Sequence, residues 1–505
     1  MTSGPTQAQV QQIAQQAEAL LKAGKPLQSA RALAPVMEQA KGNLPAALTF
    51  ARSLMLIGQH AQSAEVFAQV ARLAPGHAAA ATEQAAVLAR LGRFDEALES
   101  VRRARRAKPW FGPAVFQKAD LLADMDRGAE AAELLDSYEK HAPEAERTKL
   151  NVARACAARA RLIPKHIKPE AIVDELLEFA GNEKIPPGLR CVISARASGA
   201  LDLLGRYDEA FELQKRAKQI RNLPWDAAEH TQRVQACIKA WSSAGPDAEQ
   251  GEPVDGSGLV FIVGMPRSGS SLLEQMLSRH PLIKALGERN EITRAAQTVQ
   301  QARPGVIPII TDPNRLTPEL KERLAQEVLE SYEADREPGV EILTDKQPFN
   351  FAQLPLLARL LPGCRVIHTR RDPRDTCLSY YMQWMLGAHG QANTIEDLAL
   401  FCRDYFAIMK AWQDLPAPDA RPEIFDINYE DLVSDSEPVL RGLCAFLGIE
   451  FDEAMLDHAS GDRITNTASR EQVRSELYTS RIARWKNYEK HLAPVFEHLG
   501  DFIRD

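Results

Sequence analysis

The chain has no hydrophobic run that approaches the roughly 18 residues of a membrane span. Residues 1–16 are uncharged and rich in glutamine, so they lack the basic start and apolar core of a secretory signal peptide. The seven cysteines show no CxxC or metal-ligand spacing, and the closest two are Cys364 and Cys377. We therefore expect reduced thiols in a cytoplasmic protein with no metal site and no membrane span.

The chain also lacks the basic excess of a general nucleic-acid binder, because 61 Lys and Arg stand against 68 Asp and Glu, a net charge of −7. Its 505 residues are 45% hydrophobic and 26% charged, which is typical of a globular protein of two to four domains. The charge is uneven: residues 1–250 hold 33 basic and 29 acidic residues, and residues 251–505 hold 28 and 39. An anion site in the second half must therefore be built from a few placed cations.

A 34-residue period runs through the first half of the chain. Three amphipathic segments end at Pro75, Pro109 and Pro143, each 34 residues after the last. A turn residue between apolar-periodic stretches and a proline after the second stretch predict helix–turn–helix units. The pattern resembles the tetratricopeptide repeat. The turn residues and the small residues five positions later keep the same register: Gly24 and Ser29, Gly58 and Ser63, Gly92 and Ala97, Asp126 and Ala131.

The repeat pattern weakens after Pro143 and returns around Gly205, so we predict five to seven helix pairs in an α-solenoid over residues 8–242. Stacked repeats present a concave surface. That surface could dock an acceptor protein or peptide, or form a homodimer, and the alternative is a purely supporting role. Residues 243–257 are rich in Gly, Pro, Ser and acidic residues and predict a linker, which leaves residues 258–505 as a second domain.

Residues 259–277 predict a strand, a glycine-bounded loop and a helix. The apolar run from Leu259 to Val263 is typical of a buried parallel strand, and residues 270–277 have helical periodicity. This arrangement points backbone N–H groups and a helix start at a phosphate. The Lys-Ser/Thr pair of a nucleotide P-loop is absent after Gly269, which disfavours phosphoryl transfer from ATP. The candidate phosphate ligands are Arg267, Ser268, Gly269, Ser270 and Ser271.

The segment VGMPRSGSSLLEQML resembles the 5′-phosphosulfate loop of sulfotransferases that use 3′-phosphoadenosine 5′-phosphosulfate (PAPS). Its Pro-Arg-Ser-Gly form is similar to protein-tyrosine sulfotransferases and to bacterial relatives that carry tetratricopeptide repeats. The resemblance covers about residues 258–490. It implies an α/β P-loop-type domain with a central parallel sheet, PAPS as the sulfuryl donor, adenosine 3′,5′-bisphosphate as the product nucleotide, and no metal.

Further motifs assign roles through the same resemblance. In CRVIHTRRDPRDTCLSYYMQ, Arg371 and Ser379 match the pair that holds the 3′-phosphate, for which a guanidinium fork is well suited. In ALGERNEI, Glu288 stands where tyrosine sulfotransferases place the base that deprotonates the acceptor hydroxyl, with Glu291 a nearby alternative. In TDKQPFNFAQLP, Lys346 matches the lysine that neutralises charge on the leaving phosphate, a role shared with Arg267.

Cytosolic small-molecule sulfotransferases carry a base histidine at the position of Lys346. The absence of that histidine here favours the class of sulfotransferases that uses a glutamate base. The C-terminal segment resembles one that the family folds over the nucleotide. It departs from the family in RSEL, where relatives have Lys-Pro, and in Arg484, where tyrosine sulfotransferases have lysine. The remaining residues that align with nucleotide contacts are Tyr429, Ser469, Gln472 and Arg484.

The resulting expectation is a sulfotransferase that uses in-line transfer, with Glu288, Arg267 and Lys346 as its catalytic residues. The acceptor hydroxyl could belong to a protein or peptide tyrosine, a saccharide, a lipid or a small metabolite. Residues 295–340 are predicted to be helical in part and to shape the acceptor site. Two alternatives remain open: a P-loop kinase or nucleotidase, and a catalytically inactive repeat scaffold for protein interaction.

Overall fold

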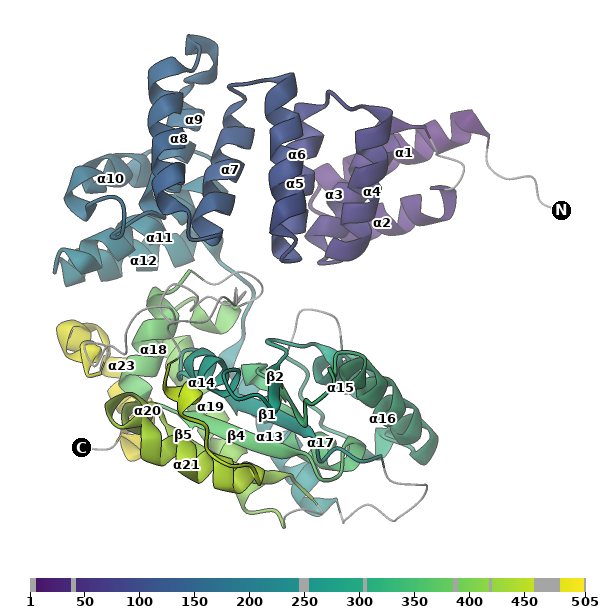
Figure 1. The fold of residues 1–505 in the computed structure, drawn as a ribbon, viewed down its shortest axis with the longest axis vertical. Coiled ribbons are helices and arrows are strands. Elements are labelled where there is room, and N and C mark those ends of the chain that lie inside the picture. Colours follow the sequence, from purple (N-terminus) through teal and green to yellow (C-terminus); the bar gives the residue numbers. More distant parts are fainter. Residues whose placement is uncertain are drawn as a thin grey trace. The chain divides into compact units, whose positions relative to one another are not determined.

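The chain folds into two compact units, Met1–Arg206 and Tyr207–Asp505. The computed structural model describes residues 6–37, 42–244, 254–302, 307–384, 389–416, 420–457 and 482–503. The first unit is built from helices and the second contains a parallel sheet (Figure 1). The predicted order of an all-α part followed by an α/β part is therefore confirmed.

The first unit consists of helices that pair with their neighbours along the chain (Figure 1). Its α-helices are α1 (Gln7–Lys22), α2 (Pro26–Leu33), α3 (Leu44–Leu56), α4 (His60–Leu73), α5 (Ala78–Arg90), α6 (Phe94–Ala107), α7 (Gly112–Asp124), α8 (Gly128–His141), α9 (Lys149–Ala160), α10 (Val173–Gly181) and α11 (Pro187–Leu203).

The 34-residue period is visible in these helices. The second helices of successive pairs, α2, α4, α6 and α8, begin at positions 26, 60, 94 and 128. The small residue of each repeat is buried where two helices of a pair meet, and Ser29 Oγ donates to Ala17 O at 2.8 Å. Ser63 Oγ donates to Ala51 O in the same way at 2.7 Å. The turn residues all have left-handed φ values: Gly24 73°, Gly58 82°, Gly92 73° and Asp126 59°.

The boundary between the units differs from the predicted one at residue 242. Helices α12 (Tyr207–Arg221) and α13 (Ala227–Ser243) belong to the second unit. Gln214 Nε2 donates to Tyr381 O at 2.9 Å, and Thr231 Oγ1 donates to Asp404 Oδ2 at 2.7 Å. Trp241 is buried in the same hydrophobic cluster as the sheet. The repeat pattern that returns around Gly205 predicts helices in this region but does not show which surface they cover.

The second unit is organised around a five-stranded parallel sheet with the order β2-β3-β1-β4-β5. The register places Phe261 opposite both Asp345 and Val366. The strands are β1 (Leu259–Gly264), β2 (Ile283–Ala285), β3 (Ile342–Asp345), β4 (Arg365–Arg370) and β5 (Glu423–Asn428).

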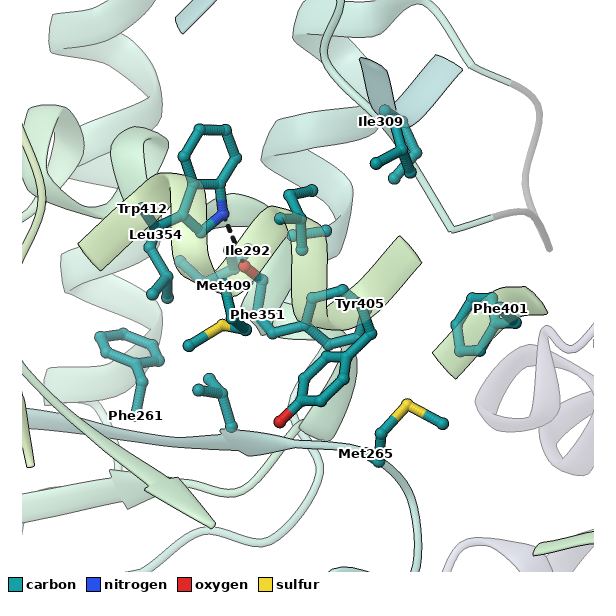
Figure 2. Close-up of a cluster of buried hydrophobic side chains, with 14 of the residues drawn as sticks. Phe261, Met265, Ile292, Ile309, Phe351, Leu354, Phe401, Tyr405, Met409 and Trp412 are labelled. Carbon is teal, nitrogen blue, oxygen red and sulfur yellow. Dashed lines mark hydrogen bonds between the residues drawn. The ribbon is translucent and has the colours of Figure 1, made fainter. Parts of the chain in front are cut away.

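Both faces of the central strand β1 are buried, as its continuous apolar run predicts. Phe261 and Val263 pack into one hydrophobic cluster, and Val260 and Ile262 pack into another. Figure 2 shows part of the first cluster, where Trp412 Nε1 donates to Phe351 O at 3.0 Å. This hydrogen bond satisfies the indole N–H inside an otherwise apolar core.

Helices cover the two faces of the sheet (Figure 1). Helix α14 has its predicted bounds. Helix α18 begins at Pro373, where proline suits a first turn and the Asp372 side chain accepts from Arg374 N. None of the helices in the described ranges is long and apolar enough to cross a membrane. The helices after β1 are α14 (Ser270–Leu277), α15 (Glu291–Gln300), α16 (Pro318–Glu333), α17 (Leu354–Leu360), α18 (Pro373–Met382), α19 (Ile395–Gln413), α20 (Tyr429–Ser434), α21 (Ser436–Leu447) and α23 (Ala493–Leu499).

The repeat turns give a test of backbone strain alone. A Cβ on Gly58 would meet no atom within 4 Å, so Gly58→Ala acts only through its φ of +82° and should lower the free energy of unfolding by about 1 kcal/mol. Asp126→Gly should instead raise the free energy of unfolding by a smaller amount, because glycine adopts the positive φ of this turn without strain. The exposed Asp126–Lys165 pair at 3.3 Å, which this change removes, contributes little. Urea denaturation followed by circular dichroism measures both, and shifts of the same sign would contradict this account.

Candidate active site

The candidate site residues follow the carboxyl ends of all five strands. Because the strands are parallel, these ends meet at one edge of the sheet, where open α/β folds bind their ligands. In the order of the strands across the sheet, this edge carries Glu288 after β2, Lys346 after β3, the loop 265–269 after β1, Arg371 after β4 and Tyr429 after β5.

The loop after β1 is tightly bent and closely packed. Gly264, Arg267 and Gly269 all have positive φ values, of 151°, 76° and 99°. A Cβ on Gly269 would lie 2.5 Å from the Tyr429 ring, so only glycine fits there. Ser268 Oγ lies 2.6 Å from Thr369 Oγ1, which fastens the loop to β4. Helix α14 begins directly after the loop, so its first N–H groups lie beside it.

The loop is also joined to the predicted 3′-phosphate pair. Arg267 Nε donates to Ser379 Oγ at 3.1 Å, and Arg371 Nη1 donates to Arg267 O at 3.2 Å. The Arg371 guanidinium carbon lies 4.6 Å from the centroid of the Tyr429 ring, a cation–π arrangement that fixes the plane of the guanidinium. Four residues that are far apart in the sequence are thus brought together, and their donors suit a phosphate-bearing ligand.

A small cavity beside this cluster has a polar side. Thr376 Oγ1 is buried there and has no hydrogen-bond partner in the part of the chain that the structure describes. A buried hydroxyl of this kind fits a site that a polar ligand or water completes. The cavity is lined by Met265, Ser268, Thr369, Arg370, Arg371, Pro373, Thr376, Cys402, Tyr405 and Phe406.

The base and lysine candidates are in direct contact. Lys346 Nζ donates to Glu288 Oε1 at 2.5 Å, although the two residues are 58 positions apart. The Lys346 side chain is 1% exposed and that of Glu288 is 43% exposed, so the pair has a buried cation and an accessible carboxylate. Glu291 is instead held by the Arg289 guanidinium at 3.1 Å and by Ser331 Oγ. Of the two candidate carboxylates, Glu288 is therefore the more accessible.

The C-terminal candidates are only partly within the described residues. Ser469 and Gln472 lie outside them. The Arg484 guanidinium carbon lies 5.8 Å from the centroid of the Tyr488 ring. The neighbouring Trp485 N–H donates to Asp375 Oδ1 at 2.9 Å, which ties this segment to α18. The segment therefore returns to the site edge, while the roles of Ser469, Gln472 and Arg484 stay predictions.

The sequence reasoning did not identify Asp345, which lies in β3 directly before Lys346. Its carboxylate is buried and accepts hydrogen bonds from Tyr332 OH at 2.7 Å and Asn350 Nδ2 at 3.3 Å. Burial raises the pKa of Asp345 to about 7, and the hydrogen bonds from Tyr332 OH and from the Arg289 backbone N–H oppose the shift without cancelling it. The sequence feature that could have indicated Asp345 is an acidic residue at the end of an apolar strand, directly before the predicted catalytic lysine.

The raised pKa of Asp345 predicts a pH-dependent contribution to stability. Because the folded pKa of about 7 exceeds the unfolded value of about 3.9, the folded state holds the proton more tightly. The stabilisation is fully present below about pH 4 and is lost as the pH rises towards 7. The difference in unfolding free energy between the wild type and Asp345→Asn should therefore shrink over this interval. Urea titrations at a series of pH values test this, and a difference that grows with pH would contradict it.

Comparisons with known proteins agree with this geometry. The model of the sulfotransferase family matches residues 260–453, which contain β1, the loop, Glu288, Lys346 and Arg371. This part of the chain is therefore similar to the sulfotransferase family.

Curated relatives extend the same finding. An uncharacterized protein of Aquifex aeolicus is 29% identical over 58% of this chain and 39% of its own length. Protein-tyrosine sulfotransferase 1 of Danio rerio is 27% identical over 45% of this chain and 65% of its own length. Protein-tyrosine sulfotransferase 2 of Gallus gallus is 25% identical over 48% of this chain and 69% of its own length. The chain thus spans about two fifths to two thirds of these relatives.

Solved sulfotransferase domains are also similar in structure. The domain from the Synechococcus PCC 7002 olefin synthase has a TM-score of 0.35 and is 22% identical over 52% of this chain and 98% of its own length. The domain from the curacin biosynthetic pathway has a TM-score of 0.35 and is 19% identical over 50% of this chain and 98% of its own length.

Proposed function

We propose that the second unit transfers a sulfuryl group from PAPS to an acceptor hydroxyl. The observation that carries the proposal is the Lys346–Glu288 contact of 2.5 Å, at the same sheet edge as the loop after β1. A carboxylate that is accessible, together with a cation that is buried, offers a proton acceptor beside a fixed positive charge. The family match over residues 260–453 supports the sulfuryl chemistry.

PAPS would supply the activated sulfuryl group. The bond from the acceptor oxygen to sulfur would form as the bond from sulfur to the bridging oxygen of the 5′-phosphate breaks. Glu288 would take the acceptor proton, and Lys346, Arg267 and the loop N–H groups would stabilise the negative charge left on the phosphate. Most of the rate would come from positioning and electrostatics, as in phosphoryl transfer.

The nucleotide would be held at the other side of the loop. Arg371 and Ser379 would bind its 3′-phosphate. Both already contact Arg267, so the groups for the two phosphates are linked before any ligand binds. Tyr429 would support the Arg371 guanidinium from its ring face. Ser268, Gly269, Ser270 and Ser271 would surround the 5′-phosphosulfate.

Replacing the base separates chemistry from binding. Glu288→Gln keeps the size of the side chain but cannot accept the proton as a carboxylate does, so turnover of PAPS should fall about 10²–10⁴-fold. The affinity for adenosine 3′,5′-bisphosphate, measured by titration calorimetry, should change by less than about threefold. Glu291→Gln is the matched control and should keep most of the activity. Parallel loss of binding and turnover in Glu288→Gln would assign this residue to structure instead.

Removing Arg371 tests the 3′-phosphate contact. A charge-assisted hydrogen bond contributes about 1.5–3 kcal/mol, so Arg371→Ala should weaken adenosine 3′,5′-bisphosphate about 10–100-fold. Adenosine 5′-monophosphate lacks the 3′-phosphate and should bind the variant and the wild type nearly equally. Equal weakening of both nucleotides would refute the assignment. Tighter binding of ATP than of the bisphosphate to the wild type would favour a kinase or nucleotidase.

The acceptor is proposed to be a tyrosine hydroxyl of a protein or peptide. This choice is supported by the similarity to proteins named protein-tyrosine sulfotransferases. The helix pairs of the first unit, with their 34-residue period, could hold such an acceptor or a second copy of the chain. Transfer of labelled sulfate from PAPS to tyrosine peptides, compared with phenols and saccharides, distinguishes this acceptor from a small hydroxylated one.

A further inference from the structure

The backbone on each side of Glu288 is held by a different buried carboxylate. Gly287 N donates to Glu274 Oε1 at 2.9 Å, and Arg289 N donates to Asp345 Oδ1 at 3.3 Å. Glu274 is 3% exposed and Asp345 is 2% exposed. The N–H groups immediately before and after the candidate base are therefore both bound by acidic side chains from the protein interior.

Both carboxylates belong to elements that carry other parts of the site. Glu274 lies in α14, which starts at the end of the phosphate loop. Asp345 is the last residue of β3 and is followed by Lys346, whose own N–H donates to Gly287 O at 2.8 Å. Three hydrogen bonds thus join residues 287–289 to helix α14 and to the end of strand β3.

Asp345 is in turn held by its own donors. Its second oxygen accepts from Tyr332 OH at 2.7 Å, and Tyr332 packs edge-on against Phe261 of β1 at 5.9 Å between ring centroids. Tyr332 is 1% exposed. The carboxylate therefore has little freedom to rotate. Through Tyr332 and Asp345, the backbone of Arg289 is held at a fixed place relative to Phe261 in the core.

Burying two carboxylates near each other is unfavourable, since each loses its hydration and the two repel. A backbone N–H can be satisfied by a neutral oxygen at less cost. Buried acidic groups next to a candidate site are therefore better explained by a role in the function of that site than by a contribution to stability. The two carboxylates accept hydrogen bonds from the residues on either side of Glu288. Their function is therefore expected to concern the position of Glu288.

We propose that Glu274 and Asp345 are positioning residues that hold the Glu288 carboxylate at a fixed place relative to Lys346 and the phosphate loop. The proposal rests on the proposed role of Glu288 as the base. Neither carboxylate contacts the reacting atoms; each acts through the backbone of residues 287–289. A displacement of the base by about 1 Å is enough to cost on the order of 100-fold in rate.

The test compares variants that remove the acceptor with variants that keep it. Glu274→Ala and Asp345→Ala should each lower kcat about 10–100-fold, leave KM for PAPS and the affinity for adenosine 3′,5′-bisphosphate within about threefold, and raise hydrogen exchange in peptides that cover residues 286–290. Glu274→Gln and Asp345→Asn still offer an amide oxygen and should restore most of both properties. Asp404→Ala is the matched control, because Asp404 is a buried carboxylate bonded to Thr231 in another part of the unit.

Tyr332→Phe provides a milder variant if an alanine variant fails to fold. It keeps the ring against Phe261, frees the Asp345 carboxylate from its hydroxyl donor, and should lower kcat several-fold with the bisphosphate affinity unchanged. Unchanged kcat in the alanine variants, or in Tyr332→Phe if these do not fold, would overturn the positioning role. An equal loss of kcat in Asp404→Ala would do the same, since it would show a general effect of stability. If the wild type itself neither bound the bisphosphate nor turned over PAPS, the proposed function would fall, and the positioning role with it.

Discussion

The parallel direction of the five strands is the constraint on which the candidate site depends. Parallel pairing places every carboxyl end at the same edge, so residues from five separate stretches of sequence converge there without any long loop. Burial of both faces of β1 keeps this central strand from shifting, because a slip of one residue would exchange the two hydrophobic clusters into which its side chains pack. The packed core therefore fixes the positions of the strand ends, and with them the positions of the candidate site residues.

Local features of this architecture could be predicted from the sequence. The strand, loop and helix at residues 259–277 were predicted within one residue, because an uninterrupted apolar run ends at Gly264 and helical periodicity begins after Gly269. The repeat helices could be predicted because Gly24, Gly58 and Gly92 mark each turn at a constant interval. In both cases the signal is a backbone requirement that only a few residue types meet.

Long-range features could not be predicted in the same way. Glu274 lies 13 positions from its partner Gly287, and Asp345 lies 56 positions from Arg289. Neither separation is a helical or strand period, so nothing in the sequence marks these pairs. The resemblance to sulfotransferases identified Glu288 and Lys346 by motif, whereas their direct contact and the buried acids behind them required the three-dimensional arrangement.

The position of the division between the two units affects how the second unit could be isolated. A fragment cut at the apparent linker, beginning near residue 258, would omit α12 and α13 and leave bare the apolar surface that Phe211, Val234 and Trp241 cover. Such a fragment would carry every candidate site residue and yet be prone to aggregate. A fragment that begins at Tyr207 keeps this surface covered. The turn at Gly205 and Arg206 is thus the place at which the two units can be separated with this surface intact.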